Sequence, residues 1–91
     1  MALSPQLQKV SDFMEELCND PAVPRNVKNI IQTARERLTS EADSVAGMSG
    51  AIYALDEVSN DINLPMHART MVWNLLSELE ALKEAELAKK Q

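Results

Sequence analysis

The sequence is poor in aromatic residues, glycine and cysteine, and each shortage argues against a class of protein. It has one phenylalanine, one tyrosine, one tryptophan and two glycines in 91 residues. Strands are enriched in aromatic and β-branched residues and tight hairpins in glycine, so a β-protein is disfavoured. Cys18 is the only cysteine, which excludes an internal disulfide and gives no sign of an oxidising compartment. We interpret Cys18 as a small packing residue.

Long apolar runs and an excess of basic charge are also missing. No stretch approaches the roughly 18 consecutive apolar residues of a membrane helix, and no basic-then-apolar secretion signal is seen. We therefore expect a cytoplasmic protein that makes no contact with membranes. The net charge of −5 opposes partners that bind through many phosphates, so nucleic acid is not the expected partner. The apolar share of 45% is that of a globular protein, and we predict one helical domain over residues 1–91.

The first predicted hairpin covers about residues 5–39. A serine followed by Pro5 signals a helix start, and apolar residues then recur at the three-four spacing of a helix face. Asn19 is expected to end this helix, because asparagine tolerates the left-handed conformation of many helix ends. Pro24 is expected to open the second helix, since a first helical residue needs no N–H.

The second predicted hairpin covers about residues 41–88. The segment 40–43 resembles a capping box, which predicts that the third helix begins there. Gly47 and Gly50 follow, and each costs about 1 kcal/mol relative to alanine inside a helix. The third helix could therefore begin directly after the cap at residues 40–43, or it could begin later in the chain because of the two glycines. Pro65 is expected to open the fourth helix.

An offset of 41 residues superimposes the helix stop, the helix start and the apolar positions of the first hairpin on those of the second. Agreement of all three features predicts an internal repeat. The polar and proline residues that match are assigned structural roles in turns and caps. They are Asn19, Asp20 and Pro24 in the first hairpin, and Asn60, Asp61 and Pro65 in the second.

Two helical hairpins in sequence predict an all-α protein with one of two arrangements. Solenoid repeats generally need three or more copies, because each hairpin leaves one face uncovered. Two hairpins folded on each other close a bundle instead. We therefore predict a four-helix up-and-down bundle of the bromodomain-like kind, with an open HEAT-like pair of hairpins as the alternative.

Several segments also carry a family resemblance: residues 19–20, 24–27, 51–61, 64–65, 67–70 and 73–82. Together they resemble an uncharacterised archaeal family of short helical chains, uncharacterised protein family 0147. The resemblance implies an archaeal source and four helices. It implies no activity, cofactor or site residue, so function has to be argued from the residues themselves.

Candidate catalytic and metal-binding residues are sparse. His67 is the only histidine, and no nucleophile motif or Glu-x-x-His pair accompanies it. Carboxylates in the first and third helices could in principle gather a metal, but they flank the apolar stripe and are better explained as a solvated face. We predict no catalytic residue, no metal and no cofactor, and hence a protein that is not an enzyme.

Basic residues collect in the second predicted helix and offer one possible binding face. Their side chains could contact phosphates, but no aromatic residues interleave them, and acidic helices lie in the same small domain. Charge balance within the domain is therefore favoured, and a nucleic-acid- or ribosome-associated factor is kept as the alternative function. The four basic residues are Arg25, Lys28, Arg35 and Arg37.

A protein-interaction module is the function that the sequence favours. Tyr53 and Trp73 flank the apolar stripes, where large aromatic side chains can anchor a partner. Gly47 and Gly50 belong to a strip of small residues that lets another helix approach closely. We expect a non-catalytic module that binds a protein partner or a second copy of itself.

Overall fold

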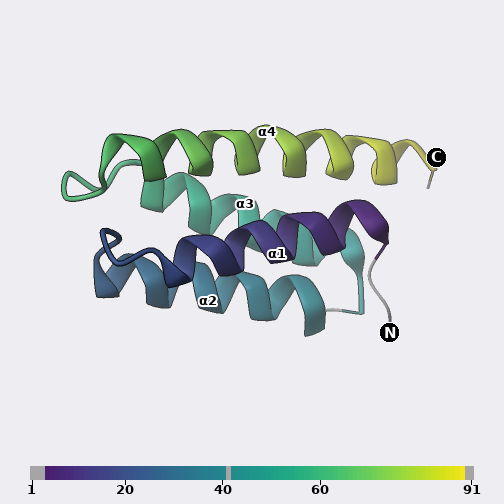
Figure 1. Cartoon of the computed structure of the whole chain (residues 1–91). Coiled ribbons are helices and arrows are strands. Elements are labelled where there is room, and N and C mark those ends of the chain that lie inside the picture. The colour runs from purple at the N-terminus through teal and green to yellow at the C-terminus, as the bar shows by residue number, and fades with distance from the viewer. Residues whose placement is uncertain (1–3, 41, 90–91) are drawn as a thin grey trace.

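The computed structural model describes residues 4–40 and 42–89, and these form four α-helices with no β-strand. The helices are α1 (Pro5–Asn19), α2 (Arg25–Ser40), α3 (Ser44–Ser59) and α4 (Met66–Lys89). The predicted all-α class is confirmed. In Figure 1 the chain runs up and down, and the α1–α2 and α3–α4 turns lie at the same end.

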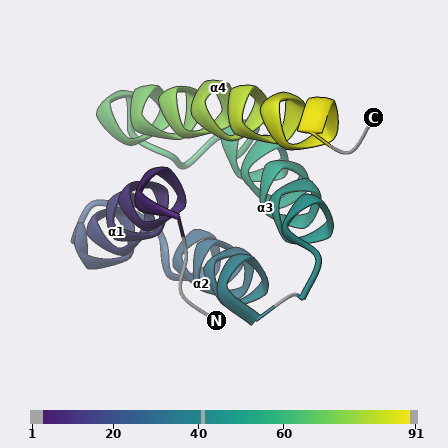
Figure 2. The same cartoon turned by 90° about the vertical axis from the view of Figure 1, so that its right-hand side faces the viewer.

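The helices form a ring around one core (Figure 2). Each helix packs against the next one in the chain, and α1 also packs against α4, whereas the diagonal pairs α1–α3 and α2–α4 do not come close. Contact between the first and last helices distinguishes a closed bundle from an open pair of hairpins. In the described part of the chain, the ring is closed.

The core repeats with the same offset as the sequence. Every buried apolar residue of the described chain except Met48 has a buried apolar residue 41 positions away. Met48 corresponds to Leu7, which is partly buried against the same core. The three-four spacing therefore places equivalent positions of both hairpins inside. The pairs are Val10/Ala51, Met14/Leu55, Leu17/Val58, Val23/Leu64, Val27/Ala68, Ile31/Val72, Ala34/Leu75 and Leu38/Leu79.

The two turns carry the same hydrogen bonds. The amide of Asp20 donates to the carbonyl of Leu17 at 3.2 Å, and the amide of Asp61 donates to that of Val58 at 3.0 Å. Each aspartate side chain also accepts from the amide two residues further on, at 2.9 and 2.8 Å. Such a bond replaces a backbone turn bond, which explains why aspartate stands at both places.

Pro24 and Pro65 occupy equivalent places directly before α2 and α4. The carbonyl of each accepts from the amide four residues further on, at 3.0 Å for Pro24 and 2.9 Å for Pro65. Each proline thus accepts the first helical hydrogen bond and supplies no N–H that would need a partner. The helices proper begin one residue later than predicted.

The first helix ends at Asn19 as predicted, but the left-handed conformation given as the reason does not occur, so that part of the prediction was wrong. Asn19 is the last residue of α1, and Asp20 follows with extended backbone angles of φ −75° and ψ 118°. Asn60 caps α3 at φ −93° and ψ 0°. Within the described residues no backbone has positive φ. The Asx turn already redirects the chain, so no left-handed residue is needed.

The predicted capping box at residues 40–43 was also wrong. Ser40 is the last residue of α2, and a cap needs non-helical backbone angles, so Ser40 cannot cap α3. Asp43 caps instead, with its side chain accepting from the Val45 amide at 2.9 Å. Residue 41, the start of the second predicted hairpin, lies outside the described residues, as do 1–3 and 90–91.

Candidate interaction surfaces

Large apolar side chains are exposed on one side of α4 and in the turn before it. Met66 is 65% exposed and Trp73 50% exposed. Their seven-residue separation is about two helical turns, so both lie on the same side of the helix. Ile62, in the preceding turn, is 90% exposed. We call Ile62, Met66 and Trp73 the α4 outer surface.

Sequence reasoning identified Trp73 but missed Ile62 and Met66. Ile62 lies in the turn between α3 and α4, and Met66 is the first residue of α4. Sequence reasoning assigned this segment to the end of one helix and the start of the next, and it did not consider the apolar side chains as a surface. The signal that could have found Met66 is its place opposite the buried stripe of α4, which contains Ala68 and Val72.

A second surface is a groove of about 390 Å³ between α2 and α3, here called the α2–α3 groove. Gly50 is one of the residues that line it, and a Cβ atom at Gly50 would lie 3.4 Å from Cδ of Arg37. The Arg37 side chain therefore crosses directly over the glycine. Gly47, the other glycine of the predicted small-residue strip, is buried. The groove is lined by Asn29, Ile30, Thr33, Ala34, Arg37, Gly50, Tyr53, Ala54 and Glu57.

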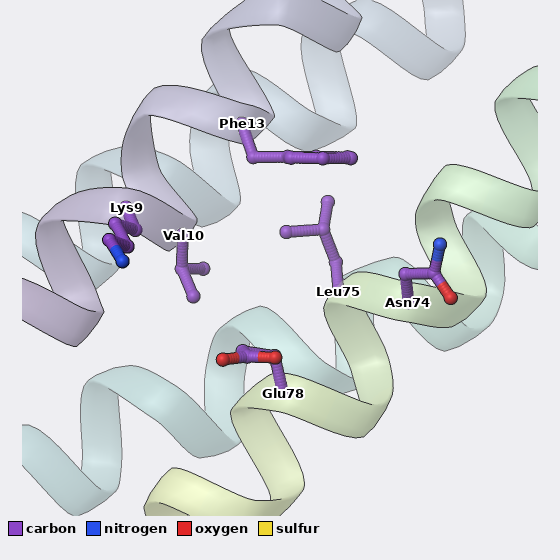
Figure 3. A pocket seen from close by; sticks show the side chains of 6 residues that line it. All are labelled: Lys9, Val10, Phe13, Asn74, Leu75 and Glu78. Atoms are coloured by element: carbon purple, nitrogen blue, oxygen red, sulfur yellow. The ribbon is translucent and has the colours of Figure 1, made fainter.

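The corresponding place in the other half of the molecule is a pocket of about 120 Å³ between α1 and α4, here called the α1–α4 pocket. In Figure 3, Phe13 of α1 and Leu75 of α4 point toward one another across it. The offset of 41 residues carries its lining onto the α2–α3 groove. Three of the residues that line the groove are smaller than their counterparts: Lys9 corresponds to Gly50, Phe13 to Ala54 and Leu75 to Ala34.

The basic residues of α2 do not form one continuous face. Nε of Arg35 donates to the carbonyl and Oγ of Ser11 at 3.1 and 3.0 Å, and Nη2 donates to Glu15 at 3.0 Å. Arg35 is therefore held against α1, whereas Arg37 lies against α3. Arg25 is exposed and Lys28 is partly buried. Only a part of the predicted basic face is left for an external partner.

His67 ties the two hairpins together. Its Nε2 lies 2.8 Å from Oδ2 of Asp20, and in the equivalent pair Nδ2 of Asn26 donates to Oδ2 of Asp61 at 3.2 Å. The Ala22 amide and, next, the hydrogen bond from His67 hold the pKa of the Asp20 carboxyl below its usual value. The offset that aligns the repeats also aligns Asn26 with His67, so both contacts occupy one repeated position. This explains His67 as a structural residue.

Cys18 lacks the surroundings of a reactive thiol. Burial raises the pKa of the Cys18 thiol, and nearby Arg35 and Lys28 offset this only in part. Its Sγ lies 3.7 Å from the carbonyl of Lys28, within reach of a weak hydrogen bond. A reactive cysteine needs a lowered pKa, so Cys18 is better explained by packing.

Across the described residues, no three His, Cys, Asp or Glu side chains are grouped so that they could hold a metal ion. Among the same residues, no helix combines the length and the apolar character that a membrane crossing requires.

Comparisons with known proteins place the chain in a family. The profile of an uncharacterised protein family (UPF0147) matches residues 2–82. A family member from Methanothermobacter thermautotrophicus is 43% identical over 77 residues, which cover 84% of this chain and 76% of the relative.

Two crystal structures share the fold. That of the unknown function protein MMP1188 has a TM-score of 0.78 and 37% identity, covering 88% of this chain and 94% of the other. That of a UPF0147 protein from Thermoplasma acidophilum has a TM-score of 0.80 and 33% identity, covering 85% and 92%. The chain thus belongs to the uncharacterised protein family UPF0147, whose known relatives include archaeal proteins and whose function is unknown.

Proposed function

We propose that this chain is a non-catalytic protein-interaction module that binds a different protein through the α4 outer surface. The observation that carries the proposal is the half-exposed tryptophan, Trp73, with Met66 on the same side of the helix. Tryptophan is rare on free surfaces and enriched among residues that anchor protein interfaces. An apolar side chain of this size gains most when a partner covers it.

The surroundings of this surface favour a protein over a charged ligand. Thr70 lies between Met66 and Trp73, and its hydroxyl donates to the Met66 carbonyl at 3.0 Å. The apolar side chains are therefore separated by a side chain whose polar group is already satisfied. A partner that presents apolar residues, such as an amphipathic helix, fits this surface.

The alternative of a nucleic-acid- or ribosome-associated factor has less support. Arg35 is engaged with Ser11 and Glu15, and Arg37 lies on a different side of α2. Phosphate binding needs several cations that reach one surface together. The test is an RNA shift assay at two salt concentrations, in which strong salt-sensitive binding would favour this alternative.

Cross-linking in the native cell tests the main proposal. A photoreactive phenylalanine analogue at Trp73 should capture one defined protein of different mass, identified by mass spectrometry. The matched control carries the same analogue at Gln32, which is exposed on α2, and should not capture that protein. Equal capture at both positions, no adduct at Trp73, or an adduct only with a second copy of the chain would refute the proposal.

A further inference from the structure

The α2–α3 groove carries opposite charges at its two ends. Arg37 lies over Gly50 at one end, and Glu57 lines the groove seven residues further along α3. At about 1.5 Å per helical residue, positions 50 and 57 are about 10 Å apart along the helix axis. Within the described chain, neither charged side chain has an ion-pair or hydrogen-bond partner. Both charges are thus free to pair with an external group.

An exposed aromatic residue lies between the two charges. Tyr53 is 77% exposed and stands midway between positions 50 and 57 on α3. Gly50 and Ala54 beside it keep the groove wall low. A second helix can therefore approach closely while Tyr53 packs against it, and tyrosine is enriched where proteins meet.

Two-fold symmetry makes this surface complementary to itself. An axis perpendicular to α3 near Tyr53 sets the α3 helices of two copies antiparallel and brings position 50 of one copy opposite position 57 of the other. Arg37 of each copy then faces Glu57 of the other, and the two Tyr53 rings meet at the axis. The contact between Arg37 and Glu57 therefore occurs twice, and the contact between the Tyr53 rings lies on the axis, as in most protein homodimers. We infer that the chain forms a homodimer through the α2–α3 groove.

The corresponding face between α1 and α4 is less complementary to itself, because it carries more carboxylates. With the same offset, Arg37 corresponds to Glu78, Tyr53 to Asp12 and Glu57 to Glu16. Two copies meeting there would bring the two Asp12 side chains together and Glu78 of one copy toward Glu16 of the other, with Lys9 as the one cation among these carboxylates, so repulsion predominates. The repeat has therefore diverged at two of these three positions, Arg37 and Tyr53, while the glutamate is common to both halves. Since each chain carries a net charge of −5, local pairing is needed to offset overall repulsion.

Charge-reversal variants test the dimer by sedimentation equilibrium at concentrations up to about millimolar, a range that detects weak association. The wild type should dimerise in a concentration-dependent manner. Arg37→Glu and Glu57→Arg should each raise the dissociation constant about tenfold or more, because like charges then face each other. An equimolar mixture of the two variants should associate again, since the two substituted side chains carry opposite charges and face each other across the axis.

Controls separate this inference from misfolding and from the α4 surface. Lys9→Glu and Glu16→Arg make the same kinds of charge change on α1, at positions that correspond to Gly50 and Glu57 of α3, and should leave the dissociation constant unchanged. Trp73→Ala should also leave it unchanged, so failure of the α4 proposal would not affect this result. Circular dichroism confirms that each variant is helical. A strictly monomeric wild type, insensitivity to either reversal, or no recovery in the mixture would overturn the inference.

Discussion

The two contacts between the hairpins come from equivalent positions of one repeat, yet they are packed differently. At the α2–α3 contact the facing residues are small, with Ala34 against Gly50 and Ala54. At the α1–α4 contact they are large, with Leu75 against Val10 and Phe13 (Figure 3). The α2–α3 contact is correspondingly the more extensive.

This difference shows how a repeat can keep its core and change its outer edge. Small residues let two helix backbones approach closely, whereas large residues hold them apart and fill the space with side chains. The deeply buried positions tolerate either small or large apolar residues, because only their apolar character is required. At the rim of each contact the polar residues differ as well: Tyr53 lies between Arg37 and Glu57 at the α2–α3 contact, whereas Lys9 and Glu78 line the α1–α4 contact.

Leu75→Ala should have the largest effect on stability among the variants that test this comparison. The substitution puts at the α1–α4 contact the alanine that stands at the equivalent position 34 of the α2–α3 contact, but it does not bring the helices closer together. Leu75 is only 4% exposed, and the truncation enlarges an existing pocket. We expect the free energy of unfolding to fall by about 2–5 kcal/mol. Urea denaturation measures this. Leu87→Ala at a 40% exposed position of α4 is the control and should change it by less than about 0.5 kcal/mol. An equal loss in both variants would contradict the comparison.

Ala34→Leu is the reciprocal change and should have the next largest effect. Ala34 is 1% exposed, so the three additional carbon atoms of leucine would have to displace the residues packed around it. Overpacking of this kind should lower the free energy of unfolding by about 1–3 kcal/mol. Ala81→Leu, on the exposed side of α4, provides the matched control. Thermal unfolding of both variants measures the effect. If Ala34→Leu were as stable as the wild type, close packing of small residues at the α2–α3 contact would be refuted.

Asp20→Asn should have a small, pH-dependent effect that sharpens the comparison of the two turns. Asparagine keeps the bond to the Ala22 amide but loses the charge that faces His67. Because the pKa of Asp20 is lowered by folding, its contribution is present above the unfolded value of about 3.9 and is lost as the pH falls through the folded value. We expect a slightly lower Tm at neutral pH and no difference from wild type in strong acid.

Asp61→Asn is the matched control for this change, because its partner Asn26 carries no charge. Its Tm should change less than that of Asp20→Asn at neutral pH. Thermal melts from neutral pH down to about pH 2, well below the usual aspartate pKa, compare the two variants. If the Asp20→Asn deficit persisted unchanged in acid, the charged contact with His67 would not be its cause.

Sequence reasoning predicted the helices better than their ends and the core better than the surfaces. The offset of 41 residues predicted equivalent roles for Pro24 and Pro65, and both accept the same helical hydrogen bond. The same offset aligns Asn26 with His67, and this alignment could have predicted that both residues make equivalent contacts with an aspartate of the other hairpin. The capping box failed at Ser40, because a four-residue pattern does not reveal whether its first residue still belongs to the preceding helix.

The candidate surfaces could be predicted only in part. Trp73 and Tyr53 stand outside the apolar stripes, so their exposure follows from helical spacing. The basic residues of α2 were grouped by spacing along the chain, but Arg35 and Arg37 contact different neighbouring helices. Periodicity gives the side of a helix on which a residue lies, and it does not say which neighbour covers that side.

By itself, the sequence determined four helices, the repeat and the identity of the core, because these depend on spacing along one chain and on local turn chemistry. Only the tertiary structure decided which helices meet. It placed Arg37 over Gly50 and Glu57 in the same groove, and it joined His67 to Asp20 across the hairpins. Such contacts depend on how closely two helices approach, which is set by the size of all facing side chains together.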